Sequence, residues 1–210
     1  NNRFLSQYRI IKSVHAQLFL CWLNNQFPEI PILFLIRHPC AVVNSKMNNK
    51  PNWFKPSIEV FLQQKELVED FLIKFEDKIR GAKSQNENYI FMWCIENYIP
   101  LKQCKGKDIL IIFYENLIVD VQNELNRIFS YLGRTYPVEA LEQIIKPSIM
   151  GGRIRSISSR EDLLDSWRKN IETEQILEAV EILKIFGLNQ IYNNENLPLV
   201  DGDIALKILN

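Results

Sequence analysis

Two short and wholly apolar runs constrain the fold of this chain more than any other feature. Ile32–Ile36 and Ile109–Phe113 each contain five consecutive apolar residues without a polar interruption. Such runs are typical of strands in a parallel sheet whose two faces are both covered by helices. Neither run approaches the roughly 18 residues that a membrane-spanning helix needs. The sequence therefore predicts an α/β fold, a three-layer sandwich with a central parallel sheet.

The segments around these runs show mainly helical periodicity. Pro39 suits the first position of a helix, and Asp120 and Thr173 are predicted N-caps. Residues 10–12 are a possible short strand, whereas the tail after Asn193 shows no period. The helices are expected at residues 14–27, 39–49, 57–75, 86–104, 121–132 and 173–186.

Length, charge and cysteine content exclude several classes of protein. The 210 residues suit a single domain over residues 1–210. Equal numbers of basic and acidic residues, 25 each, argue against a general nucleic-acid binder. With four cysteines in no C-x-x-C pair and only two histidines, neither a metal site nor a disulfide scaffold is expected. We expect a reducing compartment, the cytoplasm, with no membrane span in this chain.

The first apolar run ends at Arg37, and Ser45 lies in the helix expected to follow it. Ligands of open α/β sheets bind at the carboxyl ends of the strands. A guanidinium and a hydroxyl beside a helix N-terminus would form an anion-binding site there. The alternative is that Arg37 pairs with a surface carboxylate and that Ser45 is an ordinary helix residue.

The segment from Ile32 to Ser45 resembles the 3′-phosphate-binding segment of sulfotransferases that use 3′-phosphoadenosine 5′-phosphosulfate (PAPS). That segment is a hydrophobic strand, an arginine, a helix breaker and a serine eight residues after the arginine. The resemblance implies a P-loop-nucleotide-kinase-like fold in which Arg37 and Ser45 bind the 3′-phosphate of PAPS. It also implies sulfuryl transfer to a hydroxyl or amine of a small-molecule, lipid or carbohydrate acceptor, without a metal. A homodimer is possible.

Two later segments resemble the same family in the same order. Phe113 to Leu117 is similar to its strand-ending Tyr-Glu-Asp-Leu segment, which implies that Tyr114 contacts the nucleotide. Trp167 and Arg168 resemble the Trp-Lys pair of its C-terminal nucleotide loop. The alternative for Trp167 is an ordinary packing role.

Arg160 lies seven residues before Trp167, where relatives place a phosphate-binding arginine. The family's Lys-Gly after that arginine is replaced here by Glu161-Asp162, so Arg153 and Arg155 compete with Arg160 for the role.

His15 precedes Arg37 by 22 residues, as does the general base of many relatives. The resemblance therefore implies that His15 removes the acceptor proton and that Lys12 steadies the leaving oxygen. We expect His38 to support the site rather than to react. The alternative base is a carboxylate, Glu66 or Glu96.

The family loop that wraps the 5′-phosphosulfate has no counterpart in residues 1–9, so we expect the domain to be incomplete at its N-terminus. Residues 53–104 are predicted to form a helical insertion that serves as lid or acceptor wall, with Trp53, Phe54, Phe61 and Trp93 as apolar candidates. The alternative functions are a P-loop kinase-like phosphotransferase and a nucleotide-binding protein without activity.

Overall fold

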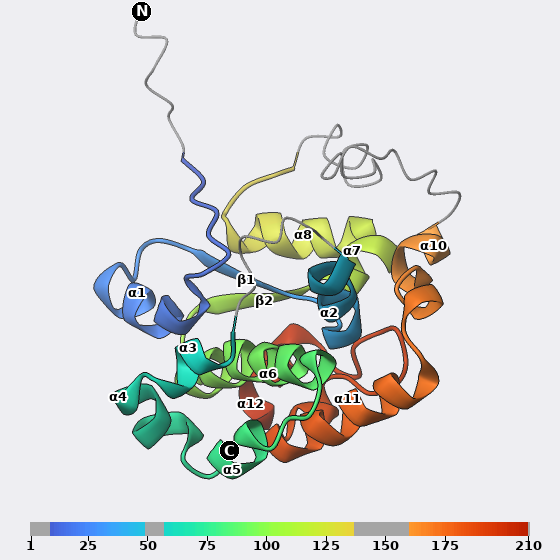
Figure 1. Ribbon diagram of the computed structural model, residues 1–210. Coiled ribbons are helices and arrows are strands. Elements are labelled where there is room, and N and C mark those ends of the chain that lie inside the picture. The colour runs from blue at the N-terminus through green and yellow to red at the C-terminus, as the bar shows by residue number, and fades with distance from the viewer. Residues whose placement is uncertain (1–8, 49–56, 137–159, 210) are drawn as a thin grey trace, which may run out of the picture.

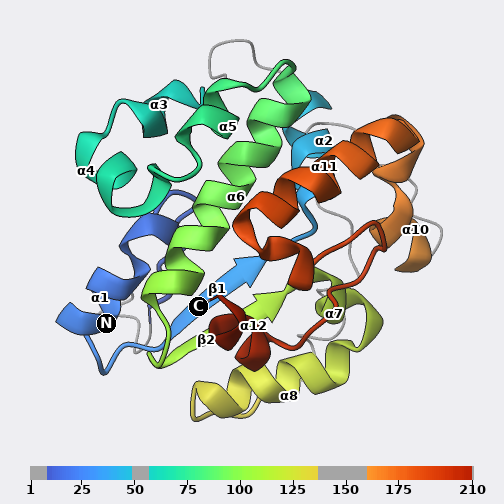
Figure 2. The same ribbon diagram turned by 90° about the horizontal axis from the view of Figure 1, so that it is seen from below.

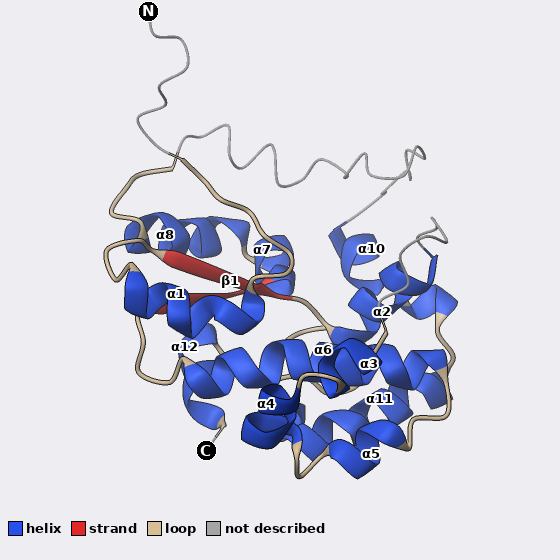
Figure 3. Cartoon of the chain, turned by 60° about the vertical axis from the view of Figure 1, so that its left-hand side comes forward, coloured by secondary structure: helices blue, strands red, loops and turns tan. Residues whose placement is uncertain are grey.

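The sheet at the centre of the molecule is small and parallel. A computed structural model describes residues 9–48, 57–136 and 160–209, and helices make up most of them (Figure 3). β1 (Ile32–Ile36) pairs in parallel with β2 (Ile109–Phe113), so that Ile32 lies opposite Ile109 and Ile36 opposite Phe113. The predicted α/β class and both predicted strands are confirmed, and the sheet has two strands within the described residues.

Helices cover both faces of β2. Leu110 and Ile112 pack against Ile128 of α8 (Val121–Tyr131) on one face. The alternate residues Ile109, Ile111 and Phe113 belong to the main core, which includes α6 (Gln85–Gln103) and α12 (Gly202–Ile208). Figure 1 shows α8 on one side of the sheet and α6 and α12 on the other.

The two strands differ in burial. All of β2 is buried, as predicted. In β1, Leu33 is 40% exposed and Leu35 is 55% exposed, so the expectation that this strand is covered on both faces is wrong within the described residues. The apolar run correctly predicts a strand. How far that strand is buried depends on the elements that pack against it, and the run carries no information about them.

Local capping explains where three of the helices begin. α2 (Pro39–Asn48) begins at Pro39, as predicted. The Asp120 side chain caps α8 by accepting a hydrogen bond from the backbone N–H of Asn123, also as predicted. α6 begins with a capping box in which Ser84 and Glu87 satisfy each other's backbone N–H groups.

Several predicted boundaries are wrong. Residues 10–12 form no strand, and the predicted helix at 14–27 is reduced to η1 (Gln17–Phe19) and α1 (Leu20–Gln26). Thr173 is the first residue of α11 (Thr173–Phe186) rather than its cap, because Glu172 forms a capping box with Gln175. The tail after Asn193 contains α12, a helix too short to show a clear period.

The helix predicted at residues 57–75 is broken. It consists of α3 (Glu59–Leu62), α4 (Lys65–Leu67) and a π-helical turn, η2 (Val68–Leu72), and α5 (Glu76–Arg80) follows. Gln64 has an extended backbone that separates α3 from α4. The irregular path nevertheless keeps Val68, Leu72 and Phe75 in the core.

The last third of the chain returns to the strand ends. It contains α10 (Arg160–Asp165), η3 (Arg168–Asn170), α11 and η4 (Leu188–Gln190) before it reaches α12. α11 packs along α6, and α12 packs against β2, in front of the strands in the view of Figure 2. This path brings Trp167 and Tyr192 to the carboxyl ends of β1 and β2.

Candidate functional site

The carboxyl ends of the two parallel strands bring Arg37 and Tyr114 together. Arg37 directly follows β1, and Tyr114 is the first residue of α7 (Tyr114–Val119), which directly follows β2. α2 and α7 therefore begin at the same end of the sheet (Figure 1). The guanidinium carbon of Arg37 lies 4.3 Å from the centroid of the Tyr114 ring, which is a cation–π contact.

A buried carboxylate lies beside this contact. Glu115 is only 3% exposed. Its Oε1 accepts a hydrogen bond from the backbone N–H of His38 at 2.9 Å, and its Oε2 accepts one from the Tyr192 hydroxyl at 2.7 Å. Burial raises the pKa of Glu115, an effect that these two bonds and the nearby Arg37 charge oppose. We call Arg37, His38, Tyr114, Glu115 and Tyr192 the strand-end cluster.

His38 is a neutral member of this cluster. Its side chain is 1% exposed and stacks on the Trp167 ring, with the centroids 4.7 Å apart. The pKa of His38 is lowered to about 4, mainly because of burial; the charges of Arg168 and Arg37 also lower it, and the bond to the Asn193 backbone opposes the shift. Because the Asn193 carbonyl can only accept, the ring donates through Nε2–H, at 3.2 Å. His38 is thus held as the neutral Nε2–H tautomer.

The Arg37 guanidinium forms no direct ion pair among the described residues. Its backbone oxygen accepts a hydrogen bond from Trp93 Nε1 at 3.1 Å, which fixes the main chain. Its Nε is buried and has no hydrogen-bond partner in the part of the chain that the structure describes. No carboxylate of that part forms an ion pair with it, so the surface-pair alternative finds no support there. A half-buried guanidinium beside the N-terminus of the ten-residue helix α2 can bind an anion.

Ser45 and the alternative bases lie on helices around the cluster. Ser45 is exposed on α2, about two turns after its N-terminus. Its neighbour Lys46 forms an ion pair with Glu96 of α6 at 3.5 Å. Glu66 is exposed on α4. Of the two alternative carboxylates, Glu96 is therefore the one that lies near α2.

Two residues predicted to bind the nucleotide, Trp167 and Arg168, make contacts within the protein. Trp167 is 2% exposed, and the Arg168 guanidinium carbon lies 4.7 Å from its ring centroid. Arg168 donates hydrogen bonds to Asn196 Oδ1 and to the Asn194 carbonyl. These contacts agree with the packing alternative for Trp167, and the nucleotide roles of both residues stay predictions.

Arg160 is the first residue of α10, and its side chain lies outside the described residues, as do Arg153 and Arg155. Lys12 and His15 lie on an exposed, irregular segment before η1, where the His15 N–H donates to Ser13 Oγ at 3.3 Å. The structure does not bring Lys12 and His15 into the strand-end cluster.

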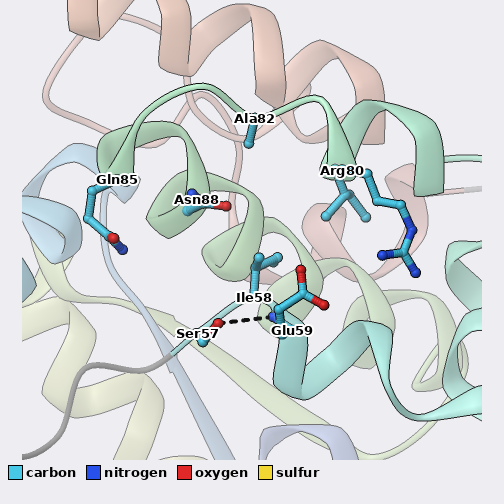
Figure 4. Close-up of a pocket in the computed structure, with 8 residues that line it drawn as sticks. Ser57, Ile58, Glu59, Arg80, Ala82, Gln85 and Asn88 are labelled. Atoms are coloured by element: carbon cyan, nitrogen blue, oxygen red, sulfur yellow. Dashed lines mark hydrogen bonds between the residues drawn. The ribbon is translucent and has the colours of Figure 1, made fainter.

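A separate hollow lies within the helical segment (Figure 4). It has a volume of about 290 Å³. Asn88 lines this hollow, whereas Trp93 contacts the Arg37 carbonyl of the strand-end cluster. The two residues are five positions apart on α6, so their side chains point about 140° apart around the helix. The hollow therefore opens on another face of α6 than the cluster. Its lining residues are Ser57, Ile58, Glu59, Ile79, Arg80, Ala82, Gln85 and Asn88.

Of the four residues proposed for the acceptor wall, two are buried. Phe61 and Trp93 belong to the hydrophobic core, whereas Trp53 and Phe54 lie outside the described residues. The described part of the helical segment thus uses these aromatic side chains for packing.

Other kinds of site find little support. Among residues 9–48, 57–136 and 160–209, no three His, Cys, Asp or Glu side chains lie close enough to hold a metal ion. Burial raises the pKa of the Cys40 thiol to about 12, which makes it a poor nucleophile at neutral pH. No helix in the described ranges is long and apolar enough to cross a membrane.

Sequence reasoning missed Glu115 and Tyr192 as site residues. Glu115 stands next to Tyr114 and directly after a buried strand, and this position was a usable signal. Tyr192 gave no such signal, because its bond to Glu115 spans 77 residues.

Comparisons with known proteins agree with the motif order found in the sequence. A family model described as a sulfotransferase domain matches residues 2–151, which include Arg37, Ser45, Tyr114 and Glu115. Searches of the curated proteins and of the solved structures each found no significant match.

Proposed function

This chain belongs to the sulfotransferase family, whose members take the sulfuryl group from PAPS, and we propose that its strand-end cluster binds the 3′-phosphate of that donor. The observation that carries the proposal is the Arg37 guanidinium. It lies on the Tyr114 ring, has no carboxylate partner among the described residues and stands beside the N-terminus of α2. A phosphate there would receive charge-assisted hydrogen bonds. Ser45 would add a hydroxyl from the second turn of α2.

The remaining parts of the site follow from the family and stay proposals. PAPS, when bound, supplies an activated sulfuryl group and adenosine 3′,5′-bisphosphate as leaving group. The acceptor hydroxyl or amine would form a new bond to sulfur as the bond between sulfur and the 5′-phosphate oxygen breaks. His15, or otherwise Glu96, would take the acceptor proton, and Lys12 would stabilise the negative charge that develops on the leaving oxygen. Arg160, Trp167 and Arg168 would complete nucleotide binding.

The acceptor is proposed to be a small molecule with a hydroxyl or amine group. The finer fold assignment, a P-loop-nucleotide-kinase-like sheet with helices on both faces, is supported by the covered faces of β2 and by the helices that follow each strand end.

A nucleotide comparison tests the assignment. Adenosine 3′,5′-bisphosphate should bind more than tenfold tighter than adenosine 5′-phosphate in titration calorimetry, because a charge-assisted contact contributes about 1.5–3 kcal/mol. Arg37→Ala should remove this preference. Arg80→Ala is the matched control, since Arg80 is a surface residue paired with Glu76. Equal affinities of the unaltered protein for the two nucleotides would refute the proposed 3′-phosphate site.

A further inference from the structure

Two consecutive residues of α7 hold the two consecutive residues that follow β1. The Tyr114 ring lies under the Arg37 guanidinium at 4.3 Å, and Glu115 Oε1 accepts the His38 backbone N–H at 2.9 Å. One contact therefore positions the Arg37 side chain, and the other fixes the main chain directly after it.

Glu115 is itself held in place by Tyr192. The Tyr192 hydroxyl donates to Glu115 Oε2 at 2.7 Å, and the Tyr192 ring is fully buried. This ring packs edge-on against His38 and Phe113, with centroids 5.1 Å and 5.7 Å away. The end of β2, the segment after β1 and the C-terminal tail are thereby joined at one carboxylate.

The arrangement leaves the charge of Arg37 available. Both Glu115 oxygens have donors, and among the described residues Glu115 makes no ion pair with the guanidinium. The Trp93 Nε1–H donates a hydrogen bond to the Arg37 carbonyl at 3.1 Å, which is a further contact that fixes this part of the main chain. A residue that only had to balance the arginine charge would be expected to contact the guanidinium instead.

We propose that Glu115 and Tyr192 are positioning residues of the nucleotide site, which fix the end of β1 so that Arg37 is held ready for the 3′-phosphate. The inference rests on the proposed function, because it assigns Arg37 to that phosphate. A binding group needs support that holds it close to its productive geometry, and a loosened strand end would move the guanidinium out of it.

The test compares the preference for adenosine 3′,5′-bisphosphate over adenosine 5′-phosphate in three variants, by titration calorimetry. Tyr192→Phe keeps the ring and removes only the hydroxyl. Glu115→Gln keeps the shape and replaces a charged acceptor with a weaker neutral one. Tyr98→Phe is the matched control, because Tyr98 is also a buried tyrosine, and its hydroxyl accepts a hydrogen bond from Lys102, on α6. Thermal unfolding is measured on the same samples.

We expect the preference to fall about threefold to tenfold in Tyr192→Phe and in Glu115→Gln, while affinity for adenosine 5′-phosphate stays within twofold. Tyr98→Phe should leave the preference unchanged, whatever it does to the unfolding temperature. A merely structural role of the pair would lower the unfolding temperature without altering the preference.

If either Tyr192→Phe or Glu115→Gln folds and keeps the full preference for adenosine 3′,5′-bisphosphate, the positioning role is overturned. An unaltered protein that shows no preference between the nucleotides would instead refute the proposed function itself. The two failures are therefore distinguishable in one series of titrations.

Discussion

Arg37 and His38 are neighbours in the chain but lie in opposite electrostatic surroundings. Arg37 is half-buried, charged and without a carboxylate partner in the described residues, whereas His38 is buried and neutral. Of these two neighbours, only Arg37 carries a positive charge, and it is the one whose side chain can meet a phosphate. The neutral imidazole packs against Trp167 and Tyr192 without adding a second positive charge that would have to be desolvated.

The lowered pKa of His38 predicts how stability depends on pH. Between pH 6.5 and about 4, the unfolded chain binds a proton on this histidine that the native protein does not. The stability linked to His38 is therefore present above pH 6.5 and is lost as the pH falls toward 4. Glu115 acts in the opposite direction, because its pKa is raised in the native state.

His38→Phe isolates this effect, because phenylalanine can stack on Trp167 but cannot titrate. From pH 7 to pH 4, the unaltered protein should lose roughly 3 kcal/mol more free energy of unfolding than the variant. Denaturant unfolding at several pH values measures the difference. Since Glu115 is present in both proteins, its contribution cancels in the comparison. Parallel pH profiles would show that His38 is not held neutral.

His15 gives a prediction about turnover. Its exposed position before η1 separates it from the buried cluster, so His15→Ala should leave nucleotide affinity nearly intact. If His15 is the general base, single-turnover transfer from PAPS to a confirmed acceptor should fall about 10²–10⁴-fold. Glu181→Gln, at an exposed carboxylate on α11, is the control. Near-normal transfer in His15→Ala would favour Glu96 as the base, and lost nucleotide binding would mean that His15 is structural.

At the level of elements, α6 depends on its capping box. This helix carries Trp93 and Glu96 toward the site, and Ser84 and Glu87 define where it begins. Ser84→Ala removes the hydroxyl that accepts the Glu87 N–H, and it should lower the free energy of unfolding by about 1 kcal/mol. Ser130→Ala is the control, since Ser130 is exposed within α8 and caps nothing. Equal effects of the two changes in denaturant unfolding would contradict the capping role.

Elements with a strong local signal were predictable from the sequence. The two apolar runs gave both strands, and Pro39 and Asp120 gave the starts of α2 and α8. Arg37 and Tyr114 could be placed at one edge of the sheet, because parallel strands end at the same side. The break at Gln64 and the helix α12 had no comparable local signal and were missed.

The rest of the cluster could not be predicted because its contacts join distant parts of the chain. The hydrogen bond from Tyr192 to Glu115 spans 77 residues, and the His38 bond to Asn193 spans 155. No periodicity relates such positions. Their meeting depends on how α11 turns at Gly187 and on how the tail then crosses beneath the sheet.

For the molecule as a whole, the C-terminal tail covers one face of β2. Leu199 N–H donates to the Ile191 carbonyl at 2.8 Å, which ties the tail to the segment that carries Tyr192. The tail then forms α12, whose first residue, Gly202, is buried against β2. The site therefore depends on a segment that lies beyond residue 151, where the match to the family model ends.

Gly202 makes this closure testable. A methyl group there would lie 2.5 Å from the Ile111 carbonyl oxygen and 3.0 Å from Ile111 Cβ, so either α12 or β2 would have to move. Gly202→Ala should lower the free energy of unfolding by about 1–3 kcal/mol, as overpacking usually does. Lys207→Ala, at an exposed position of the same helix, should change it by less than about 0.5 kcal/mol. Because alanine favours a helix more than glycine does, a stabilising effect of Gly202→Ala would show that α12 does not pack this closely on β2.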